Sequence, residues 1–263
     1  MHFDWSFFQH LLFNPPSSFV QGAIRTVYLA VISQALGVVL GLVLALWRRS
    51  GQLPLRVFAS GYIWLVRGTP LLVQAVIIYD GSSALGLYSF HTLNLGVLAV
   101  PGVIQAGIVT LALNEGAYMA EIMRAAIDSV DRGQTEAAES LGMRRRQAMR
   151  HIVLPQAMRV VIPPLGNEFN NMLKVTSLLS VIGLQELFLA AQDYNSATFR
   201  TFEIFVVAAI YYIVMTTIWS FIQSAIERRL QAKGGTNIAN VPLRQRLFGG
   251  GVFVPGEQLR GAR

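Results

Sequence analysis

An uncharged run of 21 residues reads VYLAVISQALGVVLGLVLALW and extends from Val27 to Trp47. A helix rises about 1.5 Å per residue, so a helix over this run is about 31 Å long. The hydrocarbon core of a bilayer is roughly 30 Å thick. The run therefore predicts a helix that crosses a membrane.

The composition of the whole chain agrees with a membrane protein. Of 263 residues, 53% are hydrophobic and 13% are charged, and the mean hydropathy is +0.48. A soluble domain has about 25% charged residues, so an ordinary soluble globular protein is excluded. The net charge of +7 is explained by Lys and Arg in cytoplasmic loops, and no nucleic acid partner is expected. The chain has no cysteine, which excludes disulfides and cysteine metal sites.

Four further apolar segments follow the first run: Leu55–Tyr79, Leu98–Ala126, His151–Ala190 and Phe202–Ile226. The third of these is too long for one straight helix. Prolines and a glycine predict that it is broken into pieces, namely Pro155, Pro163, Pro164 and Gly166. Five crossings result, and the expected fold class is all-α, an integral membrane protein with five transmembrane helices.

Basic residues collect in alternate loops along the chain. They follow the first, third and fifth segments: Arg48, Arg49 and Arg56; Arg132, Arg144, Arg145, Arg146 and Arg150; Arg228, Arg229 and Lys233. The intervening loops, Asp80–Gly96 and Ala191–Thr201, contain only Arg200 as a basic residue. By the positive-inside rule, this alternation predicts an N-out, C-in topology.

The two ends of the chain differ from the apolar segments. Met1–Asn14 has no basic start and contains several aromatic residues, which indicates a segment at the membrane interface rather than a cleaved signal peptide. Gln231–Arg263 is rich in Gly, Arg and Pro and is predicted to be a mostly disordered cytoplasmic tail. The interpretation is one transmembrane domain over 1–263, with an interfacial segment 1–18, spans over about 22–230, and a tail 231–263.

The loop Asp128–Arg150 has the pattern of a short helix. Thr135 or Gln134 is its expected N-cap, Glu136 lies in its expected first turn, and Gly142 lies where such a helix ends. A helix held at the cytoplasmic surface suits docking of a soluble partner. Anchoring to acidic membrane lipid is the alternative, and composition does not separate the two.

Four motifs along the chain resemble motifs of the permease family of ABC importers. Glu136–Gly142, EAAESLG, is similar to the EAA motif of these permeases, E-A-A-x-x-x-G, and Leu154-Pro155 stands where the family commonly has I-x-L-P. Three segments look like the polar amino acid branch: Arg67–Gln74 (RGTPLLVQ), Asn114–Arg124 (NEGAYMAEIMR) and Pro164–Leu178 (PLGNEFNNMLKVTSL). The resemblance covers roughly Gly22 to Leu230.

The resemblance implies that the short helix is a coupling helix that docks into a groove of a separate ATPase subunit. Residues expected to serve this coupling are Glu136, Ala137, Ala138, Leu141, Gly142, Arg144, Leu154 and Pro155. The small alanines would permit close approach, and Gly142 would let the chain turn back toward the membrane. The implied partners are ATP-binding cassette ATPase subunits, a second permease subunit, identical or homologous, and an extracytoplasmic substrate-binding protein. The implied location is the bacterial cytoplasmic (inner) membrane.

The chain itself is not expected to be an enzyme. It has no G-x-x-x-x-G-K-[ST] phosphate loop, no nucleophile and base arrangement stands out, and its four histidines lack metal-ligand spacing, so no cofactor or metal is assigned. ATP hydrolysis would occur on the partner subunit.

Polar residues in or near the spans are the candidates for a substrate path, because an unpaired charge in a membrane is expensive. They are Asn114, Glu115, Asn167, Glu168, Asn171, Lys174, Thr176 and Ser177. Acidic and amide groups could bind the ammonium of a zwitterionic amino acid, and Lys174, Thr176 or Ser177 its carboxylate. The alternative is that the groups after Pro163-Pro164 satisfy the backbone of a broken helix.

Other polar residues are interpreted as structural or gating. Glu121 is expected to pair with Arg124 one turn along. Arg67 is expected at the interface before the second span, with Thr69 as a cap and Pro70 in the first helical turn. Gly37 and Gly41 form a G-x-x-x-G motif that allows close helix packing, within the chain or at a subunit interface.

The chain departs from the amino acid branch at two positions, because Trp64 and Val175 stand where an acidic or polar residue is usual. The loss of charge at Val175 weakens the expectation of a cationic cargo. The expected function is a permease for a polar amino acid, with neutral or acidic ones first. Alternatives are a secondary transporter driven by an ion gradient, an importer of an opine-like or other amino acid analogue, and a membrane scaffold without transport.

Overall fold

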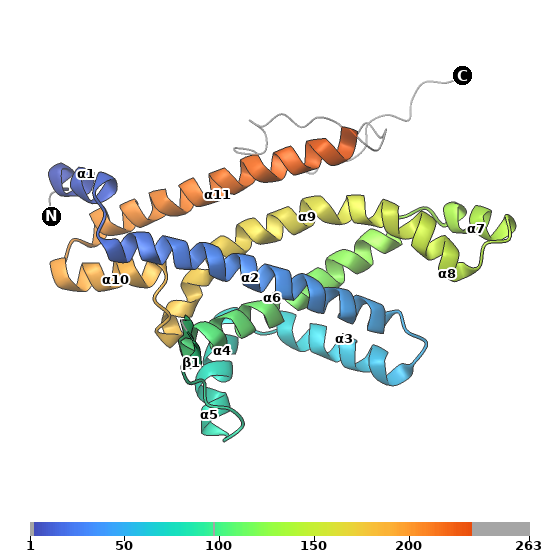
Figure 1. The fold of residues 1–263 in the computed structure, drawn as a ribbon, viewed down its shortest axis with the longest axis horizontal. Coiled ribbons are helices and arrows are strands. Elements are labelled where there is room, and N and C mark those ends of the chain that lie inside the picture. The colour runs from blue at the N-terminus through green and yellow to red at the C-terminus, as the bar shows by residue number, and fades with distance from the viewer. Residues whose placement is uncertain (1–2, 97, 233–263) are drawn as a thin grey trace.

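Helices form most of the computed structural model, which describes residues 3–96 and 98–232 (Figure 1). In chain order the elements are α1 (Trp5–Phe13), α2 (Ser17–Arg48), α3 (Leu53–Arg67), α4 (Leu71–Val76), the π-helix η1 (Ile77–Gly81), α5 (Ser82–Ala84), β1 (Leu93–Leu95), β2 (Leu98–Val100), α6 (Gly102–Asp128), α7 (Arg132–Ser140), α8 (Arg145–Ala148), the π-helix η2 (Met149–Val153), α9 (Leu154–Val175), the 3₁₀-helix η3 (Thr176–Ile182), α10 (Leu187–Thr198) and α11 (Thr201–Ala232).

Glycines let α2 and α6 pack with little space between their backbones. A Cβ at Gly37 would lie 2.5 Å from Cγ of Glu115, and one at Gly41 would lie 2.5 Å from Cβ of Met119. The G-x-x-x-G motif therefore serves helix packing within this chain.

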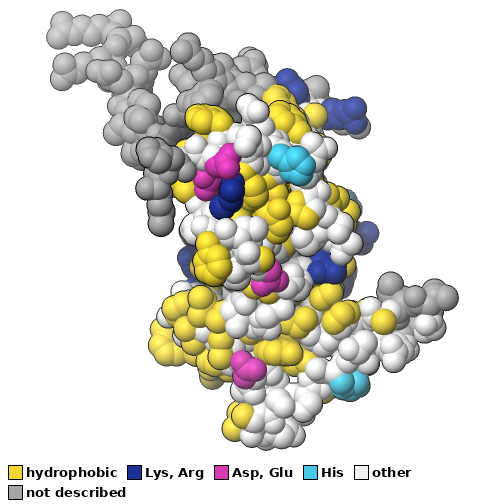
Figure 2. Space-filling view, turned by 90° about the vertical axis from the view of Figure 1, so that its left-hand side faces the viewer, with side chains coloured by type: hydrophobic (Ala, Val, Ile, Leu, Met, Phe, Trp, Pro, Cys, Tyr) yellow, Lys and Arg dark blue, Asp and Glu magenta, His cyan; other side chains and the backbone are white. Residues whose placement is uncertain are grey.

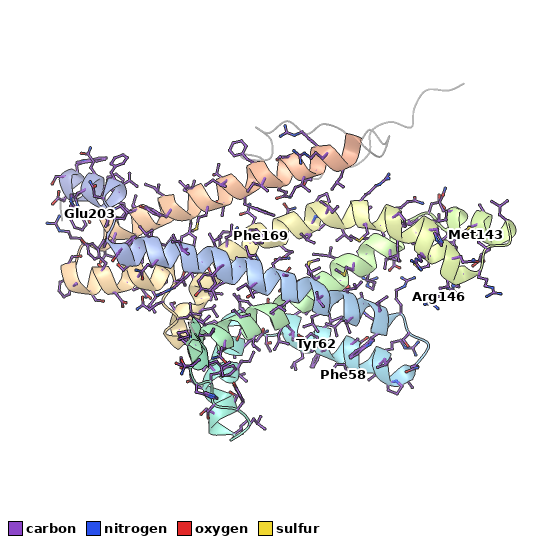
Figure 3. All side chains as sticks on the ribbon, viewed as in Figure 1. Phe58, Tyr62, Met143, Arg146, Phe169 and Glu203 are labelled. Atoms are coloured by element: carbon purple, nitrogen blue, oxygen red, sulfur yellow. The ribbon has the colours of Figure 1, made fainter. Side chains whose placement is uncertain are left out.

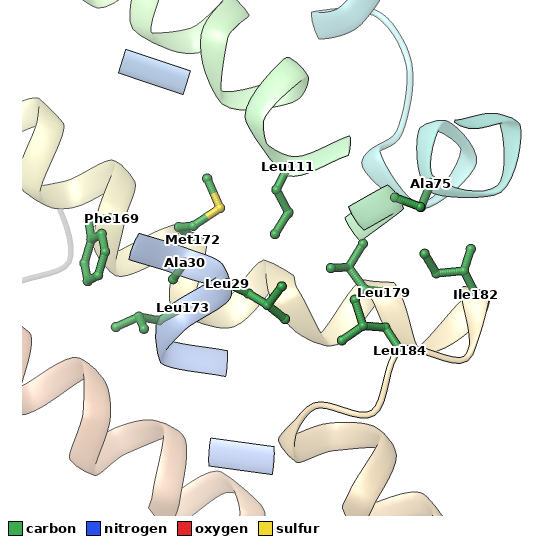
Figure 4. Close-up of a cluster of buried hydrophobic side chains, with 11 residues drawn as sticks. Leu29, Ala30, Ala75, Leu111, Phe169, Met172, Leu173, Leu179, Ile182 and Leu184 are labelled. Atoms are coloured by element: carbon green, nitrogen blue, oxygen red, sulfur yellow. The ribbon is translucent and has the colours of Figure 1, made fainter. Parts of the chain in front are cut away.

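The largest group of buried apolar side chains lies where α2, α4, α6, α9 and η3 meet (Figure 4). Leu29 comes from α2, Leu111 from α6, Met172 from α9 and Leu179 from η3, and each is buried. This core fixes the end of α9 against the middle of α6, which positions the polar residues described below.

The ends of the long helices gather different short elements. α1, α10 and the start of α11 lie at one end of the molecule, and α7 and α8 lie at the other (Figure 1). Figure 3 shows the same separation between Glu203 at the first end and Met143 and Arg146 at the second. Asn14–Pro16 separates α1 from α2.

Polar contacts hold α1 against α11. The backbone amide of Asp4 donates to Oε1 of Glu203 at 2.9 Å, and Arg200 forms an ion pair with the Asp4 carboxylate. Hydrogen bonds from the amide of Phe7, the hydroxyl of Ser6 and the guanidinium of Arg200 hold the pKa of Asp4 well below its usual range. Asp4 therefore remains a carboxylate at any physiological pH.

Two single helices are long and apolar enough to cross a membrane, Ser17–Arg48 and Thr201–Leu230, and up to four spans result if each of two bent helix pairs counts as one. Large hydrophobic side chains are exposed along α2, α3 and α11, and hydrophobic side chains cover much of the face in Figure 2. Such an apolar exterior suits lipid contact. The expected third span, now α6, is not among these candidates and contains four charged residues, Glu115, Glu121, Arg124 and Asp128.

The apolar segment Leu55–Tyr79 is not one continuous helix, and a new helix begins just after Pro70, close to the expected entry to the second span at Arg67–Pro70. The helical segments Leu53–Arg67 and Leu71–Ala84 meet at an angle of 109°. Pro70 has no amide hydrogen and disfavours helical geometry at Thr69, so α3 ends at Arg67. The segment from α4 to α5 consequently projects away from the long helices (Figure 1).

The segment His151–Ala190 is broken, as expected, but the expected position of the break is wrong. α9 runs through Pro163 and Pro164 to Val175, and the chain turns only after η3, at Gly183 with φ of +77°. Side chains of α11 support the proline region: Trp219 Nε1 donates to the carbonyl of Gly166 at 2.7 Å and Gln223 Nε2 to that of Pro163 at 3.3 Å. Neighbouring helices commonly stabilise proline in this way in membrane proteins.

Three other boundaries differ from the sequence interpretation. α2 begins at Ser17, ten residues before the uncharged run. The fold is not purely helical, because β1 and β2 pair in an antiparallel hairpin and the expected third span begins in β2. Residues 233–263 of the expected tail lie outside the described residues.

Candidate functional site

A cavity of about 190 Å³ lies between the start of α4, the middle of α6 and the junction of α9 with η3. Its wall is half polar and half apolar in kind: Thr69, Pro70, Leu71, Leu111, Asn114, Glu115, Tyr118, Glu168, Asn171, Met172, Val175 and Leu178. The apolar part is the edge of the core in Figure 4, which includes Leu111 and Met172. The polar part brings together four of the expected substrate-path residues: Asn114, Glu115, Glu168 and Asn171.

Glu115 is the most deeply buried acidic residue of the cavity wall. Its exposed fraction is 4%, and its Oε1 accepts a hydrogen bond from Gln34 Nε2 on α2 at 2.9 Å. Gly37 makes room for it, because a side chain there would overlap Glu115. The expectation that Glu115 contacts another span or faces a polar cavity is confirmed on both counts.

A chain of amide hydrogen bonds links the bend before α4 to the cavity. Asn114 Nδ2 donates to Gln74 Oε1 at 3.0 Å, and Gln74 Nε2 donates to the Thr69 hydroxyl at 2.8 Å and to the Val66 carbonyl at 2.7 Å. Gln74 thus satisfies the Val66 carbonyl, which Pro70, without an amide hydrogen, leaves without a helical partner. The prediction that Thr69 caps α4 is wrong: its hydroxyl donates back to the Leu65 carbonyl at 3.0 Å, and Pro70 occupies the N-cap position.

Tyr118 belongs to the cavity wall but was not among the expected site residues. It lies four residues after Asn114 and three after Glu115, hence on the same face of α6, and this spacing could have identified it. The Arg67 guanidinium lies over the Tyr118 ring, 5.3 Å from the ring centre. Arg67, expected only at the membrane interface, therefore stands at the margin of the cavity.

The remaining substrate-path candidates do not line the cavity. The Thr176 and Ser177 hydroxyls donate to the backbone carbonyls of Leu173 and Lys174, at 3.0 and 2.7 Å. Asn167 accepts from Gln223 at 3.2 Å, and Lys174 is exposed and is not among the lining residues. The alternative that these groups satisfy the helix backbone describes the hydrogen bonds of Thr176 and Ser177, whereas Asn167 bonds a side chain of α11.

α7 is the helix expected in the cytoplasmic loop, but it starts earlier than expected. Its N-cap is Asp131, whose carboxylate accepts from the Gly133 amide at 2.7 Å, so neither Thr135 nor Gln134 is the cap, and Glu136 lies beyond the first turn. α7 ends at Ser140, and Gly142, with φ of +84°, turns the chain just beyond it, as expected. The Gly142 and Met143 amides donate to the carbonyls of Glu139 and Ala138, which is a Schellman motif.

The two alanines of the EAA motif differ in exposure. Ala138 is 5% exposed and packs against its own chain, whereas Ala137 and Glu136 are exposed. The expectation that both alanines permit approach of a partner is therefore wrong for Ala138. Leu141 is 85% exposed at the end of the helix. An apolar side chain so exposed, beside Glu136 and Ala137, forms a small surface that the permease itself does not cover.

After α7 the chain turns back toward the long helices and begins α9 at the expected residues. Arg144 stands at the N-cap of α8 with its amide donating to Gln147 Oε1 at 2.8 Å, and α9 begins at Leu154 with Pro155 in its first turn. A second cavity of about 630 Å³ separates α7 and α8 from the ends of α2 and α6, and its lining includes Arg49, Asp128 and Glu136.

Ion pairs join the ends of α2 and α6 beside this second cavity. Glu121 pairs with Arg124, as expected, at 3.0 Å, and also with Arg48. Asp128 pairs with Arg124 at 2.9 Å and with Arg49 at 2.8 Å. Both α2 arginines are thus fixed to α6, and a structural role for Glu121 and Arg124 follows.

The described residues contain no group of three or more His, Cys, Asp or Glu side chains suited to hold a metal ion. The observed site is therefore a cavity between helices with a separate exposed helix at one end of the molecule. This arrangement can hold a small polar molecule and receive a partner protein.

Comparison with known proteins identifies the family. Residues 37–232 match the family of the binding-protein-dependent transport system inner membrane component. The arginine transport system permease protein of Corynebacterium glutamicum is 38% identical over 245 residues, covering 89% of this chain and 74% of the relative. The glutamine transport system permease protein of Escherichia coli is 36% identical over 231 residues, covering 88% and 99%.

A solved structure described as an amino acid ABC transporter with histidines has the same fold, with a TM-score of 0.76 and 41% identity over 87% of this chain and 100% of that chain. The chain is a membrane-embedded permease subunit and not an enzyme, because ATP hydrolysis is on a separate subunit in such transporters. Since the family match covers more than half of its residues, the chain belongs to the inner membrane components of binding-protein-dependent transport systems.

Proposed function

We propose that this permease carries a polar amino acid and that the cavity beside Glu115 is a station on the path of the cargo. The observation that carries this proposal is the convergence of Asn114, Glu115, Glu168 and Asn171 on one cavity of about 190 Å³. Carboxylates and amides suit the ammonium and carboxylate groups of an amino acid. Relatives named for arginine and glutamine transport support the same cargo class. An ion-gradient carrier is not favoured by the family match.

The topology proposed is five spans, N-out and C-in, in the bacterial cytoplasmic membrane. α1 lies at the end of the long helices opposite α7 (Figure 1), which supports opposite sides of the membrane for these two elements. Arg48, Arg49 and the arginines of α8 lie at the α7 end, where the positive-inside rule expects them. The chain is one transmembrane domain in this proposal, and α1 lies at the outer interface.

The exposed surface of α7 is proposed as the contact with the ATPase. Glu136, Ala137 and Leu141 are the side chains that would enter its groove, and Gly142 fixes the return of the chain. Two permease subunits would enclose the path, two ATPase subunits would bind at the α7 end, and a substrate-binding protein would deliver cargo at the α1 end. ATP-driven movement of the ATPase pair would then shift α7 and, through α8 and α9, the wall of the cavity.

The test is uptake of a labelled amino acid panel into proteoliposomes that contain the permease, its ATPase and its binding protein. ATP-dependent accumulation of one amino acid is expected. Accumulation that follows an ion gradient and ignores ATP would overturn the importer mechanism. ATPase activity without accumulation of any amino acid would overturn the proposed cargo class.

A further inference from the structure

α9 has a weak point halfway along its length. Pro163 and Pro164 have no amide hydrogen, so two consecutive hydrogen bonds of the helical ladder cannot form there. Helices change direction most readily at such positions. Because α9 leads from the α7 and α8 region to the wall of the cavity of about 190 Å³, the weak point lies between the proposed ATPase contact and that cavity.

The buried contacts of α9 differ on the two sides of the prolines. Before them, Ala157 and Val161 lie in one buried cluster with Ala126, near the end of α6. After them, Phe169 belongs to the core around η3 (Figure 4), and its ring centre lies 4.1 Å from that of Trp219 on α11. The two halves of α9 therefore rest on different parts of the molecule, with an incomplete ladder between them.

Side chains of α11 hold α9 at and after the prolines. Trp219 Nε1 donates to the Gly166 carbonyl at 2.7 Å. Gln223 Nε2 donates to the Pro163 carbonyl at 3.3 Å and to Oδ1 of Asn167 at 3.2 Å. These hydrogen bonds fix the backbone of the half of α9 that continues to the cavity wall.

A glycine makes this contact possible. A Cβ at Gly166 would lie 2.4 Å from Cδ of Gln223, so the Gln223 side chain lies directly on the backbone of α9. Glu227, one turn further along α11, accepts from the same amide at 2.9 Å and orients it. α11 contributes none of the described residues of the cavity wall. Its side chains can therefore act on the cavity only through α9.

We propose that Pro163-Pro164 is a joint in α9 and that Trp219 and Gln223 are positioning residues for the half of the helix that lines the cavity. Movement of α7 and α8 reaches the first half of α9, and the joint turns it into a change of angle between the halves. Trp219 and Gln223 set the angle at which the cavity half rests. This inference rests on the proposed coupling through α7 and adds the place at which α9 yields.

The first experiment restores the helical ladder. Pro163→Ala combined with Pro164→Ala supplies both missing amide hydrogens, and Pro155→Ala, in the first turn where a proline costs little, is the matched control. In proteoliposomes with the ATPase and the binding protein, the double variant is expected to lose about fivefold or more of its uptake per ATP hydrolysed, the usual size of a coupling between sites. Its thermal unfolding midpoint is expected to be equal or higher, because alanine suits a helix interior better than proline.

Normal uptake per ATP by the double variant overturns the joint. Each proline is also replaced singly, which restores one hydrogen bond at a time, so the decision does not depend on assembly of the double variant. Pro155→Ala is expected to retain the uptake of the unaltered permease.

The second experiment removes the donors of α11. Gln223→Met keeps the length of the side chain without its amide, and Trp219→Phe keeps an aromatic ring without its N–H group. Each is expected to lower uptake per ATP about fivefold or more at unchanged ATPase activity, because the cavity half of α9 loses its position while the ATPase contact remains. Gln156→Met is the matched control, since this exposed glutamine of α9 donates to the Ile152 carbonyl four residues earlier.

A purely structural role gives a different result for Trp219 and Gln223. Loss of fold lowers the unfolding midpoint and reduces uptake and ATPase activity in the same proportion. That result, or unchanged uptake per ATP in both variants, overturns the positioning role.

Hydrogen exchange separates this inference from the proposed function, because it needs no cargo. In the unaltered permease–ATPase complex, amides next to Pro163-Pro164 are expected to change their exchange rate when the ATPase binds ATP, and amides around Gly37, in the close contact of α2 with α6, are expected to stay protected. Exchange next to the prolines that ignores ATP, in a complex with active ATPase, overturns the joint. Absence of uptake for every amino acid overturns the proposed function, and hydrogen exchange still decides the joint.

Discussion

At the scale of single residues, Gly142 is restricted by its backbone conformation. Its φ of +84° costs a residue with a side chain about 1–2 kcal/mol, although nothing within 4 Å would obstruct a Cβ. Gly142→Val is expected to misplace the end of α7 and reduce ATP-driven uptake about tenfold, with the permease still present in membranes by immunoblot. Gly51→Val, at a glycine with equal space and no positive φ, is the control. Normal uptake by the Gly142 variant would remove α7 from the coupling mechanism.

At the scale of helices, the contact between α2 and α6 determines whether the cavity wall is in place. A Cβ at Gly41 would lie 2.5 Å from Cβ of Met119 and 3.0 Å from the Ala120 amide nitrogen, so a larger residue must separate the helices. Gly41→Val is expected to destabilise the permease by about 1–3 kcal/mol, measured as a lower thermal unfolding midpoint in detergent. Gly61→Val, on α3 with no atom within 4 Å of its Cβ position, should leave the midpoint in place. Equal midpoints for the two variants would contradict the close helix packing.

At the scale of the whole molecule, the proposed topology places Phe199 outside and Leu141 inside. These side chains are 86% and 85% exposed, and the chain has no native cysteine. In right-side-out vesicles, a membrane-impermeant maleimide should label Phe199→Cys at once and label Leu141→Cys only after the vesicles are opened. Labelling of both from the same side would contradict an odd number of crossings between residues 141 and 199.

The sequence predicted those features that depend on local chemistry. The end of α7 at Gly142, the start of α9 at Leu154 and the pairing of Glu121 with Arg124 follow from turn geometry and helical spacing. Glu115 was identified because a carboxylate in an apolar segment needs a polar environment. Features that depend on distant side chains were not predicted. The proline region of α9 stays helical because of Trp219 and Gln223, more than 50 residues later, and no local pattern could reveal that support.

The prediction for the two hydroxyl groups after Lys174 is not supported by their hydrogen bonds. Thr176 and Ser177 looked like ligands for a carboxylate, but each hydroxyl bonds a carbonyl three residues earlier, a common local use of such side chains. Tyr118 was missed although it shares a helix face with Asn114. Spacing on α6 could have predicted that residue, whereas the packing of α4 beside α6, which puts Thr69 on the same cavity wall, depends on the tertiary structure.

The contact of Asp4 with Arg200 and Glu203 has a consequence for biosynthesis. These partners are separated by 196 and 199 residues, so α1 leaves the ribosome long before its partners are made. During synthesis the first helix exposes an unpaired carboxylate and its aromatic side chains. Only a chain translated past Glu203 can bury that face. A prematurely terminated permease thus differs from the finished one at its very first helix, where quality-control proteases can distinguish them.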